Sequence, residues 1–299
     1  GGTDVIDGGG GDDVLKVDGF LGSTIEGGSG SDSLDLVGLT NQVLVSGVEV
    51  ITGSLGSDHL TVTSNHIQQI SGGGGTDEVL LTSGAGNTVL LDGVEFIAGG
   101  SGSDHLTVIS NHIQQISGGS GRDEVLLTSS AGNTVELSGV EVITGGLGSD
   151  HLTVTSNHIQ QISGGGGTDE VLLTSGAGNT VLLDGVEFIA GGSGSDHLTV
   201  TDDTSVSIDG GLGSDTLIGG LGNDTLQGGG GDDVFVVDGG EDTFDGGQGH
   251  DTVDFSSSVS GVSVDLSSGT LVDGSGLVDE FTSVESVIGS DFLDVITGS

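Results

Sequence analysis

Aspartates recur every nine residues between Gly210 and Asp254, each after a glycine-rich stretch. The segment reads GGLGSDTLI-GGLGNDTLQ-GGGGDDVFV-VDGGEDTFD-GGQGHDTVD, so the shared unit is two glycines, any residue, glycine, any residue and Asp. Glycine adopts backbone angles that other residues avoid, so such a turn can direct its carbonyl groups at one point. Carboxylate and carbonyl oxygens are the ligands of Ca²⁺, which takes about six to eight of them. One turn supplies too few, and the pattern therefore predicts calcium held between stacked turns.

The predicted metal ligands fall into two sets. The aspartates at the sixth place of each turn are Asp13, Asp32, Asp58, Asp77, Asp104, Asp123, Asp150, Asp169, Asp196, Asp215, Asp224, Asp233, Asp242 and Asp251. The glycines at the second and fourth places of the best copies are Gly211, Gly213, Gly220, Gly222, Gly229 and Gly231. Asp242 belongs to a looser copy that lacks the full glycine pattern. The alternative, a solvated turn aspartate, is disfavoured because stacked unpaired carboxylates repel one another.

Short strands must position these turns. The three residues after each aspartate, such as Thr216-Leu217-Ile218, alternate outward, inward and outward, which predicts a very short strand. The fold class predicted is therefore all-β, a parallel β-roll or β-solenoid of stacked short coils with calcium-binding glycine-rich turns.

The repeated unit is similar to the RTX (repeats-in-toxin) nonapeptide GGxGxDxUx, a calcium-binding β-helix repeat. The resemblance is strict over residues 210–254 and looser over nearly all the rest of the chain. It implies a parallel β-roll, calcium between adjacent turns and secretion through a type I pathway.

The charge of the chain excludes some partners. Forty-five acidic residues accompany only two basic ones, Lys16 and Arg122, for a formal net charge of -43. Phosphate binding needs lysine and arginine, so we expect no nucleic-acid partner. An anionic membrane surface would repel the chain, and no apolar run in the sequence is long enough to span a bilayer, so membrane insertion is not expected. Stacked carboxylates oppose folding until cations neutralise them, which predicts a chain that is loose at low calcium and rigid at high calcium.

Four segments differ in their repeat type. Residues 1–37 carry a first set of RTX turns, 38–209 a solenoid with a period of 46 residues, 210–254 the tandem nonapeptides, and 255–299 an RTX-linker β segment in which Asp291 restarts the array. The sequence begins and ends in the middle of a motif, and we interpret it as a fragment of a longer array. Composition supports a repeat protein, since 64 residues are glycine and proline, cysteine and tryptophan are absent.

The 46-residue unit is predicted to hold five short strands. In its first copy these are 59–63, 66–70, 78–82, 87–91 and 94–98. The aspartates alternate at spacings of 19 and 27 residues, interpreted as one ordinary turn and one turn with an additional strand. All of them from Asp58 to Asp215 are accordingly expected in a single column along one edge. The opposite edge would carry SGAGNT, with Thr88 in the aspartate slot, and the middle of the chain would bind calcium on one edge only.

An outward leucine recurs as Leu80, Leu126 and Leu172. Exposed apolar residues in register indicate that something covers them. The favoured interpretation is that the additional strand 94–98 folds over these leucines. The alternative is lateral contact with another chain, giving self-association into fibres or sheets.

Histidines also recur, as His59, His105, His151 and His197 next to an aspartate. An Asp-His pair could belong to a catalytic dyad, but its repetition argues against one reaction centre. Zinc is a second possibility, although successive copies lie too far apart to share an ion. Outward, solvated histidine is the favoured interpretation. Neither HExxH nor GxSxG occurs, so metalloprotease and hydrolase motifs do not appear in this sequence.

These patterns favour a non-enzymatic function: a calcium-dependent extracellular structural or adhesive region, such as a stalk, filament or surface-layer material, of a secreted RTX protein. Residues 55–108 recur letter for letter as 147–200, which suits a spacer of variable length. One alternative is an accessory calcium-binding module of a secreted enzyme, such as a protease or alginate epimerase. A second is a carbohydrate- or ice-binding module, for which the Thr61–Thr63 pattern is too irregular.

Overall fold

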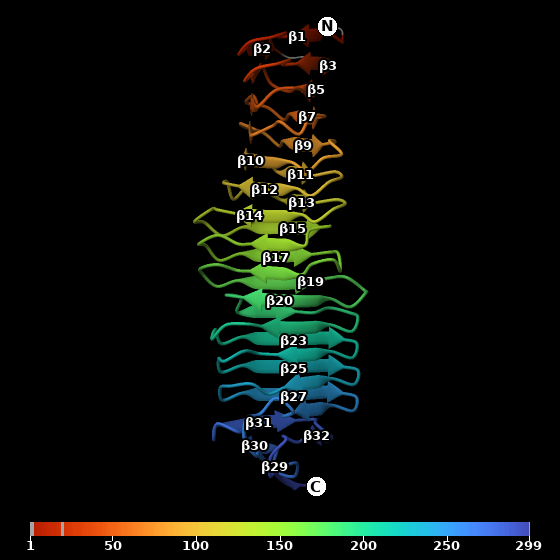
Figure 1. Cartoon of the computed structure of the whole chain (residues 1–299), viewed down its shortest axis with the longest axis vertical. Coiled ribbons are helices and arrows are strands. Elements are labelled where there is room, and N and C mark those ends of the chain that lie inside the picture. The colour runs from red at the N-terminus through yellow and green to blue at the C-terminus, as the bar shows by residue number, and fades with distance from the viewer. Residues whose placement is uncertain (1–2, 19–20, 299) are drawn as a thin grey trace. The chain divides into compact units, whose positions relative to one another are not determined.

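A computed structural model describes residues 3–18 and 21–298 of the chain. By internal contacts the chain divides into two compact units, Gly1–Asp150 and His151–Ser299. In the described residues both units are built from strands without any helix, and each forms a parallel β-solenoid as expected (Figure 1). No helix of the described residues is long and apolar enough to cross a membrane.

In the first unit the chain alternates between two parallel sheets, one of odd-numbered and one of even-numbered strands. The odd-numbered strands are β1 (Val5–Asp7), β3 (Leu21–Glu26), β5 (Gln42–Ser46), β7 (His59–Val62), β9 (Glu78–Leu81), β11 (Phe96–Ala98), β13 (Gln115–Ser117) and β15 (Thr134–Ser138). The even-numbered strands are β2 (Val14–Asp18), β4 (Ser33–Val37), β6 (Val50–Thr52), β8 (Gln69–Ser71), β10 (Thr88–Asp92), β12 (His105–Val108), β14 (Glu124–Leu127) and β16 (Val142–Thr144).

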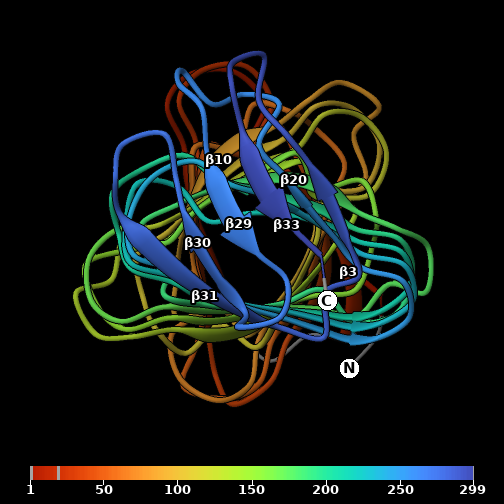
Figure 2. The same ribbon diagram turned by 90° about the horizontal axis from the view of Figure 1, so that it is seen from below.

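The second unit repeats this alternation and ends in a different arrangement. Its odd-numbered sheet contains β17 (His151–Val154), β19 (Glu170–Leu173), β21 (Phe188–Ala190), β23 (Ser207–Leu212), β25 (Thr225–Gly230), β27 (Thr243–Gln248), β29 (Ser263–Asp265), β31 (Val278–Thr282) and β33 (Val295–Thr297), together with β30 (Thr270–Val272). The even-numbered strands are β18 (Gln161–Ser163), β20 (Thr180–Asp184), β22 (His197–Val200), β24 (Thr216–Ile218), β26 (Val234–Val236), β28 (Thr252–Asp254) and β32 (Ser286–Ile288). Strands β29, β30 and β31 pair antiparallel and lie side by side in the end view (Figure 2).

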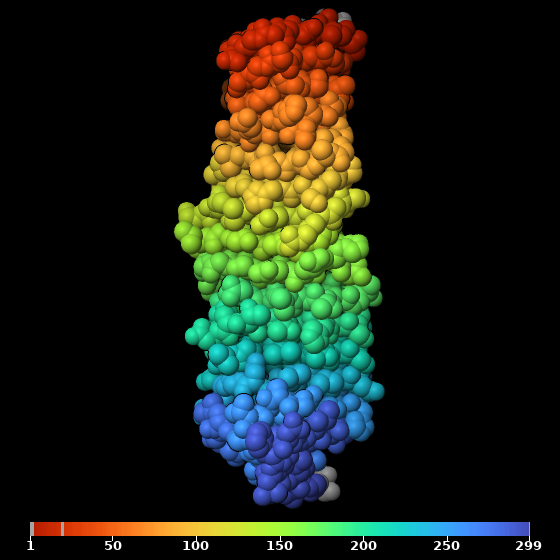
Figure 3. All heavy atoms as spheres, viewed as in Figure 1, coloured from red at the N-terminus to blue at the C-terminus, as the bar shows by residue number. Residues whose placement is uncertain are grey.

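The core lies between the two sheets of each unit. Every second residue of a strand points inward, as in β9, where Val79 and Leu81 are fully buried while Leu80 is half-buried. Register keeps these positions aligned, because Leu60, Val79 and Ile97 are direct partners in three neighbouring strands. The space-filling view shows successive coils within each unit in contact (Figure 3). In the second unit, Phe235 and Phe244 pack with their ring centroids 5.4 Å apart.

The strand positions agree with the sequence expectation for the 46-residue unit. The first copy contains β7 to β11, five strands, and β12 begins the next copy. The second expected strand is displaced, since β8 covers Gln69–Ser71 rather than 66–70. The division of the chain into four segments by repeat type stays a prediction.

One packing expectation is wrong. The strand predicted over 94–98 forms as β11, but it does not cover Leu80. Instead, β11 pairs edge to edge with β9 in the same sheet, with Ala98 opposite Leu80. The physical reason is that Val94 and Ile97 are themselves core residues, so the strand must keep its inward face in the solenoid.

Candidate metal centre

The glycine turns adopt a backbone that other residues avoid. In the turn 210–215, Gly211 and Gly213 have φ values of 96° and 138°, in the region that favours glycine. The same pair of positive angles at the second and fourth places occurs in the turns 8–13, 27–32, 72–77, 99–104, 118–123, 164–169, 191–196, 228–233 and 246–251. Among the six predicted glycines, Gly222 alone lies outside this region. A side chain there would still collide with the backbone of Thr204 in the neighbouring coil.

The first glycine of each turn makes room for the aspartate carboxylate. A Cβ atom on Gly210 would lie 2.6 Å from Oδ2 of Asp215, and one on Gly118 would lie 2.7 Å from Oδ2 of Asp123. The carboxylate therefore folds back against the start of its own turn. Only glycine leaves this cradle open, which explains the first letter of the motif.

Backbone amides connect the aspartates from one coil to the next. The amide of Asp215 donates to Oδ1 of Asp233 at 2.8 Å, and the amide of Asp233 donates to Oδ1 of Asp251 at 2.9 Å. Asp13 and Asp32 are joined in the same way at 2.8 Å. Each carboxylate thus uses one oxygen to hold the preceding coil, and the stacked turns form a ladder of aspartates.

The second carboxylate oxygen of most ladder aspartates is buried without a hydrogen-bond partner. These Oδ2 atoms belong to Asp13, Asp32, Asp77, Asp104, Asp123, Asp196, Asp215, Asp224, Asp233, Asp251 and Asp279. A buried charged oxygen without a partner is costly. A row of them is the signature expected of sites that a cation fills.

Burial raises the pKa of these carboxyl groups. It is the main cause that raises the pKa of Asp77 to about 7 and that of Asp215 to about 6, since desolvation disfavours the charged form. Hydrogen bonds from backbone amides act in the opposite direction, and neighbouring carboxylates raise the pKa values further. The site is therefore electrostatically unfavourable for carboxylates alone and favourable for carboxylates with a divalent cation.

The donor set fits calcium. In the described part of the chain no three His, Cys, Asp or Glu side chains gather closely enough to hold a metal by themselves. Consecutive carboxylates come from different coils, so the glycine-turn carbonyls must supply the remaining oxygens, as a hard cation with many oxygen ligands requires. This agrees with the sequence prediction that one turn is insufficient.

The expectation of a single column of aspartates is wrong. Asp58 and Asp77 precede β7 and β9 of the odd-numbered sheet, whereas Asp104 and Asp123 precede β12 and β14 of the even-numbered sheet. The physical reason is that five is an odd number: after five strands the next copy begins in the other sheet. Candidate ligands consequently occur at both edges of the middle segment. The expectation that these aspartates line only one edge is therefore also wrong.

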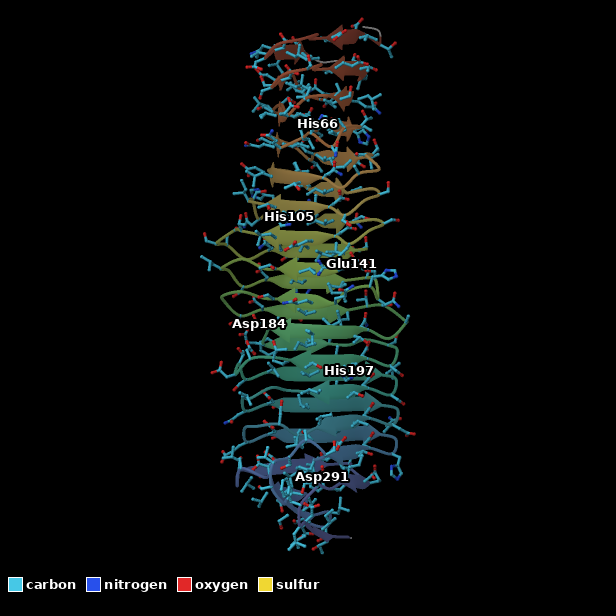
Figure 4. The ribbon with its side chains drawn as sticks, viewed as in Figure 1. His66, His105, Glu141, Asp184, His197 and Asp291 are labelled. Atoms are coloured by element: carbon cyan, nitrogen blue, oxygen red, sulfur yellow. The ribbon has the colours of Figure 1, made fainter. Side chains whose placement is uncertain are left out.

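Two ladders of the middle segment run Asn-Asp-Asp-Glu, and the sequence analysis did not predict the residues at their two ends. In one ladder the amide and the side-chain Nδ2 of Asn87 donate to Oδ1 of Asp104 at 2.7 and 2.6 Å. The ladder continues from Asp104 to Asp123 at 2.8 Å and ends where the amide of Asp123 donates to Glu141 at 2.6 Å. Figure 4 marks the position of Glu141. Other ladders differ in length but have the same kinds of ends: Asn41, Asn133 and Asn179 stand at the start, and Glu49, Glu95, Glu187 and Glu285 at the end.

A simple count along the turn would have found the asparagines. Asn87 is the sixth residue of the turn 82–87 and therefore occupies the place of the aspartate. The sequence analysis assigned that place to Thr88, which instead begins β10. The glutamates belong to the recurring Val-Glu motif. The turn that carries this motif is short, so a longer side chain is needed to reach the amide of the ladder aspartate in the neighbouring coil. Asp294 likewise takes the slot assigned to Asp291: its Oδ1 accepts the amide of Val262 at 3.0 Å.

The predicted aspartates do not all have the same environment. Both carboxylate oxygens of Asp58 accept hydrogen bonds, Oδ2 from the amide of Ser54 at 2.6 Å. Ser54 occupies the second place of this turn, where other copies have glycine. In the turn of Asp150, the amide of Gly146 donates to Oδ2 at 3.0 Å. These two turns are closed by their own hydrogen bonds and are the weaker candidates for metal binding.

The repeated histidines face outward and pair with glutamates. Nδ1 of His59 lies 2.7 Å from Glu78, and Nδ1 of His105 lies 3.0 Å from Glu124, in both cases the direct partner on the next coil. His151 and Glu170 form the same pair at 2.7 Å. In His197 the partner position is Thr216 instead. The side chains of His59 and His105 are 37% and 41% exposed, and Figure 4 labels His105 and His197 along the solenoid. The histidines therefore belong to the surface and not to the candidate metal sites.

Comparison with known proteins supports the assignment of the turns. The family model of the RTX calcium-binding nonapeptide repeat (4 copies) matches residues 1–20, 209–244 and 218–253. A search of curated proteins finds no match to the chain. The matched residues include Asp13, Asp215 and Asp233, whose Oδ2 atoms are buried without a partner, and equivalent turns such as 27–32 and 99–104 lie outside the match. Residues 1–20 and 209–253 therefore match the RTX calcium-binding nonapeptide repeat.

Proposed function

We propose that this chain is a calcium-dependent extracellular structural or adhesive region of a secreted protein, acting as a stalk, filament or surface-layer material. The observation that carries the proposal is the row of buried, unpartnered Oδ2 atoms at stacked glycine turns. Calcium, when bound, would neutralise the negative charge of these carboxylate oxygens.

Calcium binding would be coupled to folding. With a formal charge of -43, the chain repels itself when its carboxylates are ionised. The ladder aspartates approach one another only in the folded coils, so the free energy of binding contributes to the free energy of folding. A chain of this kind stays loose for export where calcium is scarce and becomes rigid outside the cell. Export through a type I pathway is part of this proposal.

A structural role, without enzymatic activity, is supported by repetition. The candidate ligands recur at fixed places of the 46-residue unit, and residues 55–108 and 147–200 are identical. Such duplication changes the length of a solenoid without changing its local interactions, since each coil contacts only its neighbours. Repeated equivalent sites suit a scaffold better than a single reaction centre.

We also propose that the chain self-associates. Leu39 and Leu55, at turns of the first unit, are 76% and 84% exposed, and exposed leucines on a soluble surface favour contact with another chain. Sedimentation velocity in calcium tests this directly. A larger species that grows with protein concentration is expected, whereas a constant monomer at all concentrations would contradict lateral association.

Far-ultraviolet circular dichroism during a calcium titration tests the folding switch. We expect little β-structure in chelator and a cooperative gain of β-signal as calcium is added, with magnesium far less effective because it requires a tighter octahedral shell. A chain that is fully β-structured in chelator would overturn the proposal. Single-molecule pulling then tests the structural role, with resistance to extension expected in calcium and lost in chelator.

A further inference from the structure

Each unit has a shallow hollow on its odd-numbered strands, where a phenylalanine lies beside a glutamate. The larger hollow, of about 500 Å³, lies in the first unit, and the outward residues that line it are Glu78, Phe96, Ala98, Gln115, Ser117 and Ser138. The smaller hollow, of about 120 Å³, lies in the second unit and is lined by Glu170, Phe188, Ala190, Ser207 and Asp209. Neither lining includes a ladder aspartate, so calcium binding at the glycine turns does not explain these hollows.

Strand register accounts for the hollow of the first unit. Phe96 on β11 lies directly opposite Glu78 on β9 and Gln115 on β13, and neighbouring strands are about 4.8 Å apart. Two residues along β11, the next outward position holds Ala98, which lies opposite Ser117. These small side chains leave open the space that the phenyl ring and the carboxylate border.

The hollow of the second unit repeats this arrangement. Phe188 is 50% exposed and lies opposite Glu170. The next outward position again holds an alanine, Ala190, which here lies opposite Asp209. Both hollows begin in the identical copies of the repeat, so a phenylalanine bordered by a carboxylate belongs to the repeat and not to one coil.

The repeat between these two copies has the glutamate without the aromatic ring. Glu124 contacts His105 as Glu78 contacts His59, but its partner on the other side is Val142 of β16. The chain therefore contains a matched position in which only the phenylalanine is missing.

The carboxylate beside each ring is accessible to a cation. The side chains of Glu78 and Glu170 are 56% and 57% exposed, and the histidine contacts Oε2 of each. A cation is attracted to the face of an aromatic ring. The planar guanidinium of arginine both stacks on aromatic faces and pairs with carboxylates. A ring and a carboxylate on adjacent strands are close enough for one guanidinium to contact both.

The cation must come from a different molecule. Lys16 and Arg122 are the two basic residues of the sequence, and Lys16 pairs with Asp35 at 2.9 Å. A second copy of this chain therefore offers almost no cations. The formal charge of -43 repels anionic ligands and attracts basic ones, whereas a neutral sugar would gain nothing from this charge.

We propose that the hollows at Phe96 and Phe188 bind arginine side chains from a basic segment of another protein. In each, the guanidinium stacks on the phenyl ring and pairs with the neighbouring glutamate, Glu78 or Glu170. The inference rests on the proposed function, because it gives the adhesive role a class of partner. It requires the folded solenoid but no ion in the hollow, so the two can be tested separately.

Isothermal titration calorimetry of the full chain with a tetra-arginine peptide amide tests the site, in saturating calcium and about 150 mM salt to screen distant charges. The double variant Phe96→Leu and Phe188→Leu keeps the charge and apolar bulk but loses both rings. Its affinity should fall about two- to fivefold, the usual size of an exposed cation–π contact. Val142→Leu is the matched control and should bind as the parent chain does. A tetra-lysine peptide should bind the parent chain more weakly than tetra-arginine.

A second pair of variants tests the carboxylates and decides the matter if the leucine variant does not fold. Glu78→Gln with Glu170→Gln should weaken the binding of tetra-arginine, whereas Glu124→Gln, beside Val142, should have little effect. Circular dichroism in calcium verifies the fold of each variant.

The outcomes separate this inference from the proposed function. A folded parent chain whose affinity for tetra-arginine is the same as that of the leucine and glutamine double variants would overturn the arginine site alone. Phenylalanine-dependent binding of cellohexaose, a neutral sugar, without such binding of tetra-arginine would overturn it in favour of a glycan. A parent chain that stays unfolded in calcium would overturn both.

Discussion

At the scale of single residues, the ladder aspartates perform two tasks with two oxygens. Oδ1 of Asp233 accepts the amide of Asp215 and so joins neighbouring coils, while Oδ2 stays buried and unpartnered. An Asp→Asn change keeps the size of the side chain and an acceptor for the amide, but removes the charge. The substitution therefore separates metal binding from hydrogen bonding.

The Asp215→Asn and Asp233→Asn variants are expected to need more calcium to fold. Loss of one charged ligand costs on the order of 1.5–3 kcal/mol, which corresponds to a shift of roughly tenfold or more in the calcium midpoint. Circular dichroism in a calcium titration measures it. Asp203→Asn, an exposed residue of the same unit, should leave the midpoint unchanged; an equal shift in the control would show that net charge alone is responsible.

Acid should act in opposite directions with and without calcium. Burial raises the folded-state pKa of Asp77 and Asp242 to about 7 and of Asp224 to about 6, against 3.8 for an ordinary aspartate. The calcium-free folded state therefore takes up protons, so its stability is fully present below about pH 4 and is lost as the pH rises through 6 to 7. In chelator, β-structure should increase as the pH falls from 7 to 4.

With calcium present, protons compete for the same oxygens. The calcium midpoint should consequently rise as the pH falls from 7.5 to 5.5, which the same titration measures. A midpoint that is independent of pH would mean that carboxyl groups with ordinary pKa values bind the ion.

At the scale of elements, the glycine turn sets how closely two coils approach. Gly231 has a φ of 136°, and a Cβ atom there would collide with the carbonyl of Gly213 in the neighbouring coil. Its neighbour Gly230 has no such angle, and a Cβ atom there would meet only the Leu212 side chain at 3.4 Å. Two adjacent glycines of one turn thus offer a matched comparison.

Gly231→Ala should destabilise the calcium-bound protein by about 1–2 kcal/mol or more, from the backbone angle alone, with the collision adding to it. Gly230→Ala should change stability by less than about 1 kcal/mol. Thermal unfolding in saturating calcium measures both. Equal effects at the two positions would contradict the turn geometry described here.

The outward His-Glu pairs should contribute little. His59 and Glu78 lie on the surface, with side chains 37% and 56% exposed, and exposed ion pairs are typically worth about 0–1 kcal/mol. A double-mutant cycle of His59→Gln and Glu78→Gln should give a coupling energy in that range. The pair His197 and Thr216 serves as the control without a carboxylate; a coupling of several kcal/mol at His59 would assign the pair a larger role.

For individual elements, the sequence predicted the local structure of strands and turns better than it predicted the sheet to which each strand belongs. The alternation in Thr216-Leu217-Ile218 and the glycine spacing define strand and turn, because both depend on neighbouring residues only. The sheet to which Asp104 belongs depends instead on how many strands precede it, and a spacing of 27 residues does not state that count. Glu141 was missed because only stacking reveals that it occupies the place of an aspartate, whereas the sixth place of Asn87 in its turn could have been counted from the sequence.

At the scale of the whole molecule, charge and repetition lead to the same dependence on cations. Forty-five acidic residues face two basic ones, and the ladders bury a carboxylate at turn after turn in each unit. Apolar burial between the sheets favours the fold, whereas this buried charge opposes it. The fold therefore requires cations wherever glycine turns stack.

Crystals grown in calcium, measured for anomalous scattering, test that requirement most directly. We expect anomalous peaks between the stacked turns that contain Asp196, Asp215, Asp233 and Asp251, with an ion about 2.3–2.6 Å from the carboxylate oxygens. Glycine turns without ions, with the aspartate side chains turned toward water, would contradict it.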